Sequence, residues 1–182
     1  MSEEEVTTQN DVENSSQNKI DHHRMDDHGI TQQFLTFTVG GEEYGVEITK
    51  IREIKGWAET TRLPNSPSFM KGVINLRGLV IPIFDLRGRF SMGTTEPTEK
   101  NVVIIIALEE RLVGVLVDTV SDILSVDSND IRPAPQIETD LDVEFIDGLI
   151  SIKDKMVVLL NVNNLFDAET MQDVTKALGE KG

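Results

Sequence analysis

Histidine and cysteine, which carry much of the nucleophilic and acid–base chemistry of enzymes, are nearly absent from this sequence. There is no cysteine, which excludes thiolate chemistry and disulfides. The three histidines, His22, His23 and His28, all lie in an acidic N-terminal segment. Neighbouring aspartates such as Asp21 could complete a metal site with them, but a segment this polar is expected to be a solvated tail. No metal or other cofactor is therefore predicted, and no histidine remains for the rest of the chain.

Carboxylates are the remaining candidates for acid–base catalysis, and four of them stand in or beside expected strands: Glu47, Asp85, Asp118 and Asp122. Nothing in the spacing of Asp118 and Asp122 makes them a catalytic pair. Asp85 directly follows an expected strand and aligns with Asn161 in an internal repeat. Because an amide cannot transfer a proton, this position is predicted to cap a turn. No glycine-rich phosphate-binding pattern follows a strand. We therefore predict structural or solvated roles for all four carboxylates and a protein that is not an enzyme.

Arg77, Glu53 and Trp57 are candidates for binding a partner rather than for catalysis, and each also has a plainer interpretation. Arg77 stands at the tip of an otherwise apolar hairpin, and its planar guanidinium suits a carboxylate or amide of a partner, although a solvated arginine is the plainer interpretation. Glu53 belongs to a run of alternating apolar and charged residues and could equally face solvent. Trp57, the single tryptophan, is expected in a core or between two lobes rather than as an anchor.

An internal repeat gives these residues their setting. Gly72–Phe90 returns as Gly148–Phe166 without a gap, at an offset of 76 residues, and Phe34–Ile54 aligns with Val103–Ile123 at an offset of 69. The composition of Ser91–Lys100 is that of a linker, and it falls where the first copy ends. The chain is thus two versions of one small β unit, and such self-similarity usually reflects a repeated structure.

Each copy supplies about five short strands, a pattern typical of a small barrel. We therefore predict an all-β fold of two five-stranded barrels related by an approximate two-fold. The first barrel is expected at about 32–92 and the second at about 101–166, with exchange of elements between them allowed. Units of this size bury only about 60% of their unfolded surface, so an apolar seam between the barrels is expected. Pro82 is expected at a sheet edge or a bulge because it cannot donate to a ladder.

The two ends of the chain differ from this repeated body. Residues 1–30 hold eight acids and two bases without helical or strand periodicity, which predicts a disordered acidic tail over 1–31. Residues 167–182 are expected to hold a C-terminal helix, since Met171, Val174 and Leu178 share a helical face and Gly179 follows them.

Charge and hydropathy exclude two classes of partner. The net charge is −15 and aromatic residues are few, so neither the basic stripe nor the stacking platform of a nucleic-acid-binding protein is present. The longest apolar run, Val102–Leu108, is far shorter than the about 20 residues that a membrane helix needs. A cytoplasmic protein without direct membrane insertion is therefore expected.

Residues 32–166 resemble the CheW family of chemotaxis coupling proteins. The segments that carry the resemblance include FLTFTVGGEEYGVEITKIREIKG, GVINLRGLVIPIFDLRGRF, GVLVDTVSDILSV and IRPAP. The NLRG and VIPIFDLR elements are specific when they occur together. The N-terminal extension and the final helix lie outside the resemblance.

The resemblance implies two five-stranded β-barrels, SH3-like or OB-like, and a non-catalytic adaptor. Such an adaptor would link the cytoplasmic tips of methyl-accepting chemoreceptors to the regulatory domain of the histidine kinase CheA in membrane-associated receptor arrays, where other copies of the adaptor are further possible partners. The receptor tip would dock between the barrels near five positions: Ile48, Ile51, Glu53, Arg77 and Val102. The second copy has Lys153-Asp154 where the first has Arg77-Gly78, so this role is expected of the first copy alone.

Other assignments stay open on the sequence alone. A CheW-like scaffold could serve a receptor–kinase assembly outside chemotaxis. A CheV-type coupler would carry a receiver, for which the residues after Phe166 leave no room, and a kinase regulatory domain would need an ATP-binding domain upstream. An unrelated enzyme on a double barrel is disfavoured by the missing cysteine and the lack of histidine after His28. The residues of a kinase interface and the role of the acidic tail are not assigned.

Overall fold

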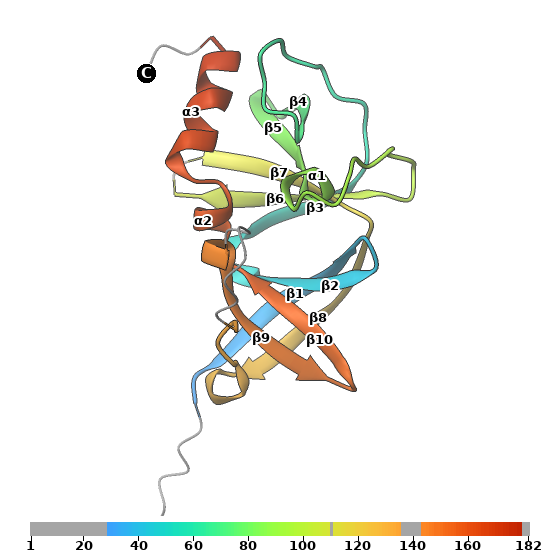
Figure 1. Cartoon of the computed structure of the whole chain (residues 1–182). Coiled ribbons are helices and arrows are strands. Elements are labelled where there is room, and N and C mark those ends of the chain that lie inside the picture. Colours follow the sequence, from blue (N-terminus) through green and yellow to red (C-terminus); the bar gives the residue numbers. More distant parts are fainter. Residues whose placement is uncertain (1–28, 110, 136–142, 180–182) are drawn as a thin grey trace, which may run out of the picture.

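Two five-stranded sheets make up most of the computed structural model, which describes residues 29–109, 111–135 and 143–179 (Figure 1). The first sheet has the strand order β8-β1-β2-β10-β9, formed by β1 (Thr31–Val39), β2 (Glu42–Glu47), β8 (Thr119–Asp127), β9 (Ile146–Ile152) and β10 (Lys155–Leu160). The second has the order β3-β6-β7-β5-β4, formed by β3 (Ile51–Gly56), β4 (Met70–Leu76), β5 (Leu79–Asp85), β6 (Val102–Leu108) and β7 (Arg111–Val117). The predicted all-β class of two five-stranded units is confirmed.

Short helices connect and flank the strands. The α-helices are α1 (Leu86–Arg89), α2 (Val162–Leu165) and α3 (Ala168–Ala177), and the 3-10 turns are η1 (Ile48–Lys50), η2 (Ser128–Asp130) and η3 (Val143–Phe145). The predicted acidic tail lies almost wholly outside the described residues, which begin at Gly29.

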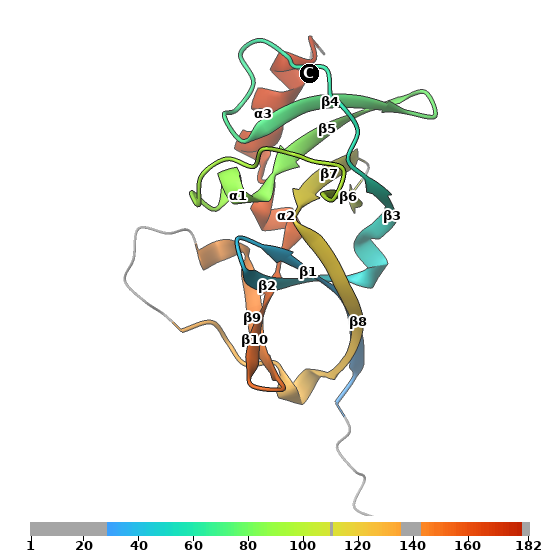
Figure 2. The same cartoon turned by 90° about the vertical axis from the view of Figure 1, so that its right-hand side faces the viewer.

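In each sheet an isolated β-bridge joins the two edge strands and closes the sheet into a barrel. In the second sheet Thr61, which follows β3, pairs with Val73 of β4 through backbone hydrogen bonds of 2.9 and 2.8 Å. In the first sheet Arg132, which follows β8, pairs with Leu149 of β9 at the same two distances. The two closures occupy equivalent places in the repeat, and Figure 2 shows the resulting barrels stacked one above the other.

The barrels do not follow the repeat boundaries. Residues 51–117 form the whole second barrel as one continuous segment, whereas the first combines residues 31–47 with residues 119–160. The predicted limits of about 32–92 and 101–166 are therefore those of the two sequence copies and not those of the two barrels. The reason is long-range parallel pairing: β10 of the second copy pairs with β2 of the first, and β5 of the first copy pairs with β7 of the second.

A pair of repeated glycines permits this exchange. Gly45 of β2 lies opposite Leu159 of β10, and Gly114 of β7 lies opposite Ile83 of β5. A Cβ atom at Gly45 would stand 2.9 Å from Leu159 Cδ2, and one at Gly114 would stand 2.3 Å from Ile83 Cδ1. The space that these glycines leave is filled by the side chain that the other copy inserts into each barrel.

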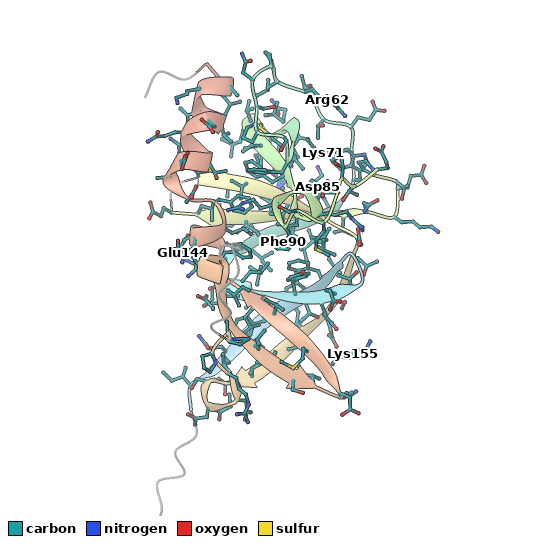
Figure 3. All side chains as sticks on the ribbon, viewed as in Figure 1. Arg62, Lys71, Asp85, Phe90, Glu144 and Lys155 are labelled. Carbon is teal, nitrogen blue, oxygen red and sulfur yellow. The ribbon has the colours of Figure 1, made fainter. Side chains whose placement is uncertain are left out.

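The predicted apolar seam is present between the barrels. Side chains from both sheets and from the short helices form one buried cluster, the seam cluster: Leu35, Phe37, Val39, Val46, Met70, Phe84, Leu86, Ile104, Ile106, Leu108, Val113, Val115, Val117, Leu160, Val162, Leu165, Phe166 and Val174. Separate clusters fill the two barrel interiors, and Trp57 packs against the one in the second barrel, as a core residue should. Aromatic rings span the seam: Phe90 stacks on Tyr44 of β2 with ring centroids 4.9 Å apart (Figure 3).

Pro82 does not lie on an edge strand, because β5 stands between β7 and β4. The expected bulge is nearby but on the neighbouring strand, where the β4–β5 register shifts between Met70 and Gly72. Proline is tolerated because the parallel ladder to β7 begins only at Ile83, so the missing N–H of Pro82 interrupts no bond to β7.

The predicted C-terminal helix is α3, which lies against the second barrel (Figure 1). Val174 is buried in the seam cluster, Met171 and Leu178 pack against that cluster, and Gly179 follows with φ of 72°. Asp167 caps the first turn by accepting a hydrogen bond of 2.9 Å from the backbone N–H of Thr170. This bond holds the pKa of the Asp167 carboxyl below its usual 3.8.

We expect Asp167→Ala to loosen α3 in a pH-dependent way. Removing an N-cap typically costs about 1 kcal/mol, so amide exchange in α3 should accelerate about fivefold at neutral pH. Because the folded-state pKa lies below the unfolded one, the contribution is complete above about 3.8 and is lost as the pH falls through the folded-state value. The difference from the unaltered chain should therefore shrink in acid. Asp167→Asn, which caps without titrating, is the control; a difference that stays constant in acid would contradict the assignment.

Candidate partner-binding site

The four carboxylates considered for catalysis have structural partners. Asp85 caps α1 and Asn161 caps α2, each accepting from the backbone N–H two residues on, which confirms the predicted capping role at this repeated position. Glu47 accepts from the hydroxyl of Thr49, and Asp122 accepts from the backbone N–H of Ile123. In the described part of the chain no group of three or more His, Asp or Glu side chains could hold a metal ion.

Asp118 stands where the chain crosses from the second barrel to the first. Its Oδ2 accepts hydrogen bonds from Gly40 N at 2.8 Å and from Arg87 Nη2 at 2.9 Å, and its own N–H donates to Thr38 O at 2.9 Å. Gly40 and Thr38 belong to the first barrel and its hairpin, whereas Arg87 belongs to α1 beside the second. Asp118 therefore ties the two barrels together.

We expect Asp118→Ala to lower the free energy of unfolding by about 1–2 kcal/mol, because two hydrogen bonds are lost, one of them the ion pair with the Arg87 guanidinium. Urea denaturation followed by Trp57 fluorescence measures this change. Asp122→Ala is the matched control: its carboxylate accepts from its neighbour's N–H, so a change within about 0.5 kcal/mol is expected. Equal losses in both variants would show that Asp118 does not link the barrels.

Strand β3 positions two of the five predicted binding residues, Ile51 and Glu53. Ile51 lies opposite Ile106 of β6, and Glu53 lies opposite Ile105. Strand β3 therefore has one extra residue, Arg52, which forms a β-bulge. Ile106 packs in the seam cluster, whereas Ile105 packs inside the second barrel. This bulge therefore directs Ile51 and Glu53 to opposite faces of the sheet, although their spacing in an undistorted strand would place them on the same face.

The structure brings Glu53 and Arg77 together. The Arg77 guanidinium donates from Nη2 to Glu53 Oε2 at 2.5 Å, across the opening between the β4–β5 hairpin and β3. The Arg77 side chain is 73% exposed and that of Glu53 29% exposed. An ion pair this open contributes little to stability, about 0–1 kcal/mol, and its exposed guanidinium can reach a partner with its other N–H groups.

The other three predicted residues are spread along the same ladder. Ile48 begins η1, the turn by which the chain enters the second barrel, and Ile51 follows it. Val102 lies opposite Gly56 at the far end of β6, about 13 Å from the position opposite Ile51. Ile51 and Val102 are half-buried against the seam cluster. The five residues, called the β3–β6 band, form no compact pocket: Ile51 and Val102 lie on the seam side of the sheet, Glu53 lies on its opposite face, and Arg77 reaches Glu53 from the β4–β5 turn.

Three exposed apolar side chains near this band were not singled out from the sequence. Ile54 of β3 is 46% exposed, and Leu79 and Val80, which follow the Arg77-Gly78 turn, are 56% and 54% exposed. The sequence does carry a signal for the last two, because an apolar pair directly after a two-residue hairpin turn extends beyond the barrel wall. Ile54 adds apolar surface on the strand that carries Glu53, as the centres of protein interfaces require, whereas Leu79 and Val80 line a groove with α3.

Comparison with known proteins identifies the family. The family model described as a CheW-like domain matches residues 33–170. The chain belongs to the CheW family. The chemotaxis protein CheW of Klebsiella aerogenes is 43% identical over 142 residues, which cover 78% of this chain and 86% of that protein. The chemotaxis protein CheW of Bacillus subtilis is 33% identical, over 78% of this chain and 90% of its own length.

A solved structure supports the same assignment. The crystal structure of the scaffolding protein CheW from Thermoanaerobacter tengcongensis matches with a TM-score of 0.70 and 30% sequence identity, covering 81% of this chain and 96% of that one. The family resemblance predicted from the NLRG and VIPIFDLR segments is thus confirmed. Across the described residues, no helix is long and apolar enough to cross a membrane.

Proposed function

We propose that this CheW-family chain is a non-catalytic adaptor that couples methyl-accepting chemoreceptors to the regulatory domain of the histidine kinase CheA. The observation that carries the proposal is the exposed Arg77–Glu53 pair on the β3–β6 band, in a chain whose relatives are named chemotaxis proteins. A charged pair with apolar neighbours suits recognition of a receptor tip, because the charges fix orientation while the apolar side chains supply the buried area.

Within this proposal the five band residues have distinct roles. Arg77 and Glu53 set the orientation and specificity of the receptor tip, and Ile48, Ile51 and Val102 provide apolar contact beside the seam. The kinase would bind apolar outer surface of the barrels, and further copies of the chain would join it in rings. The protein would act in the cytoplasm, recruited to receptor arrays at the membrane, and would make and break no bonds itself.

The test is reconstituted autophosphorylation of CheA with receptor-containing membranes, measured with and without the full chain. Strong stimulation that requires receptor, kinase and this protein together is the expected result. No stimulation with the cognate kinase and receptors would remove the chemotaxis role and leave a CheW-like scaffold for another receptor–kinase assembly. Phosphate release in the absence of kinase would contradict the non-catalytic role.

A further inference from the structure

The linker between the two copies fills a defined site at one end of the second barrel. Thr95 of this linker is 7% exposed, and it donates from its backbone N and its Oγ1 to the two carboxylate oxygens of Asp85, each at 2.7 Å. Asp85 is itself 1% exposed. Lys71 Nζ donates to the Thr95 carbonyl at 2.6 Å and lies 3.7 Å from Asp85 Oδ2 (Figure 3). An extended peptide segment is therefore bound there by one cation, one anion and the cap of α1.

The repeat places an equivalent set of residues in the first barrel. At the offset of 76, Asp147 is equivalent to Lys71, Asn161 is equivalent to Asp85, and α2 is equivalent to α1. The local geometry is equivalent as well: Asn161 caps α2 as Asp85 caps α1, and Asn161 Nδ2 donates to Asp147 Oδ1 at 3.0 Å, where the second barrel has its Lys71–Asp85 pair.

Among residues 29–109, 111–135 and 143–179, nothing fills this site in the first barrel. Both residues line a cavity of about 460 Å³ with Phe34, Val46 and Leu159 among its apolar walls. That volume falls in the range of about 300–1,000 Å³ that binding clefts commonly have. The segment at the linker's equivalent position is 167–176, which instead forms the start and body of α3 and lies against the second barrel. Among the described residues, none takes the place that Thr95 takes in the second barrel.

The open site is more negative than the filled one. The cation Lys71 is replaced by the anion Asp147, and the anion Asp85 by the neutral Asn161. Among the described residues that line the cavity, Glu47 adds a second anion against a single cation, Lys50. A ligand that copied Thr95 would meet a carboxylate where the second barrel offers an ammonium to its carbonyl, whereas a positively charged side chain would be attracted to Asp147.

We propose that this cavity of the first barrel binds an extended peptide segment of a partner protein and places a lysine or arginine side chain of that segment on Asp147. Asp147, Asn161 and α2 hold the positions at which the second barrel binds its linker, and the charge of the cavity selects a basic segment. The proposal does not depend on the receptor coupling proposed above, since none of the five band residues lines the cavity.

The probes are three capped hexapeptides based on Gly93–Thr98 of the linker: the unaltered sequence, one with Thr95→Lys and one with Thr95→Glu. Each is titrated into the isotopically labelled full chain, and backbone amide shifts are recorded by NMR. The lysine peptide should give saturable shifts confined to the cavity, at Gln32, Ser128 and Asn161–Asn163, and should bind about fivefold more tightly than the glutamate peptide. No saturable binding, shifts outside the cavity, or equal affinities for the two peptides would overturn the proposal.

Two variants separate the charge of the site from its shape. Asp147→Asn keeps a hydrogen-bond acceptor for Asn161 and removes the charge, so the preference for the lysine peptide should disappear while the amide spectrum stays that of a folded chain. The double variant Asp147→Lys with Asn161→Asp reproduces the residues of the second barrel and should bind the unaltered threonine peptide best. An unchanged preference for lysine in both variants would show that Asp147 does not select the ligand.

Discussion

Gly72→Ala is expected to lower the free energy of unfolding by roughly 3–5 kcal/mol, a large part of the total for a small domain. Gly72 has φ of 134°, a conformation that side-chain-bearing residues rarely adopt, and a Cβ there would stand 2.3 Å from the Thr61 carbonyl oxygen. That oxygen accepts the hydrogen bond from Val73 that closes the second barrel. The backbone therefore cannot move away from the new methyl group without opening the closure.

Two other glycines separate the causes of this loss. Gly78 has φ of 87°, but a methyl group added there would meet nothing within 4 Å, so Gly78→Ala should show the conformational cost alone, about 1–2 kcal/mol. Gly56 has neither constraint, and Gly56→Ala should be nearly neutral. Denaturation followed by Trp57 fluorescence reports on all three, since Trp57 packs inside the same barrel. If Gly72→Ala is as stable as Gly78→Ala, then the Thr61–Val73 bridge can shift away from the added methyl group at little cost, which would contradict the prediction.

Local structure could be predicted from the sequence because its causes are local. The hairpin expected at Arg77 is formed by the two-residue loop Arg77-Gly78, and both of its residues have positive φ, as do those of the Gly40-Gly41 and Lys153-Asp154 loops; tight hairpins require this backbone. The repeat offset of 76 also predicted that Asp85 and Asn161 share one role, and both are helix caps.

The assignment of strands to barrels could not be predicted in the same way. A gapless repeat shows which residues are equivalent, but it does not show whether a hairpin pairs within its own copy or with the other one. That choice is made by long-range contacts such as Ile83 against Gly114 and Leu159 against Gly45. Both alternatives bury the same side chains, so the hydrophobic pattern is identical for each.

The candidate site was predicted as residues but not as geometry. Arg77 and Glu53 are 24 positions apart, and they meet only because the second sheet closes on itself. The opposite facing of Ile51 and Glu53 depends on the bulge at Arg52, and the sequence IREI is equally compatible with a regular strand. Bulges arise from pairing with a neighbour, so a single strand's sequence carries little information about them.

Arg77→Glu is expected to reduce receptor-dependent stimulation of CheA about tenfold or more while leaving the fold intact. In the proposed receptor contact the reversal replaces an attractive charge by a repulsive one, and orienting charges of this kind cost about 1.4 kcal/mol or more when lost. The fold should change little, by less than about 1 kcal/mol, because the ion pair is open to solvent. Reconstituted autophosphorylation gives the first quantity and thermal unfolding the second; loss of the cooperative transition would make Arg77 structural instead.

The double variant Glu53→Arg with Arg77→Glu tests whether the ion pair serves to close the barrel or to contact the receptor. The swap restores a salt bridge between the β4–β5 hairpin and β3, so a purely structural pair would recover full stimulation. A receptor tip that binds through both charges would find the positive and negative charge exchanged. Stimulation should then stay as low as in Arg77→Glu alone. Because both variants can be compared at equal thermal stability, recovery in the double variant would assign the pair to barrel closure, and failure to recover would assign it to the receptor contact.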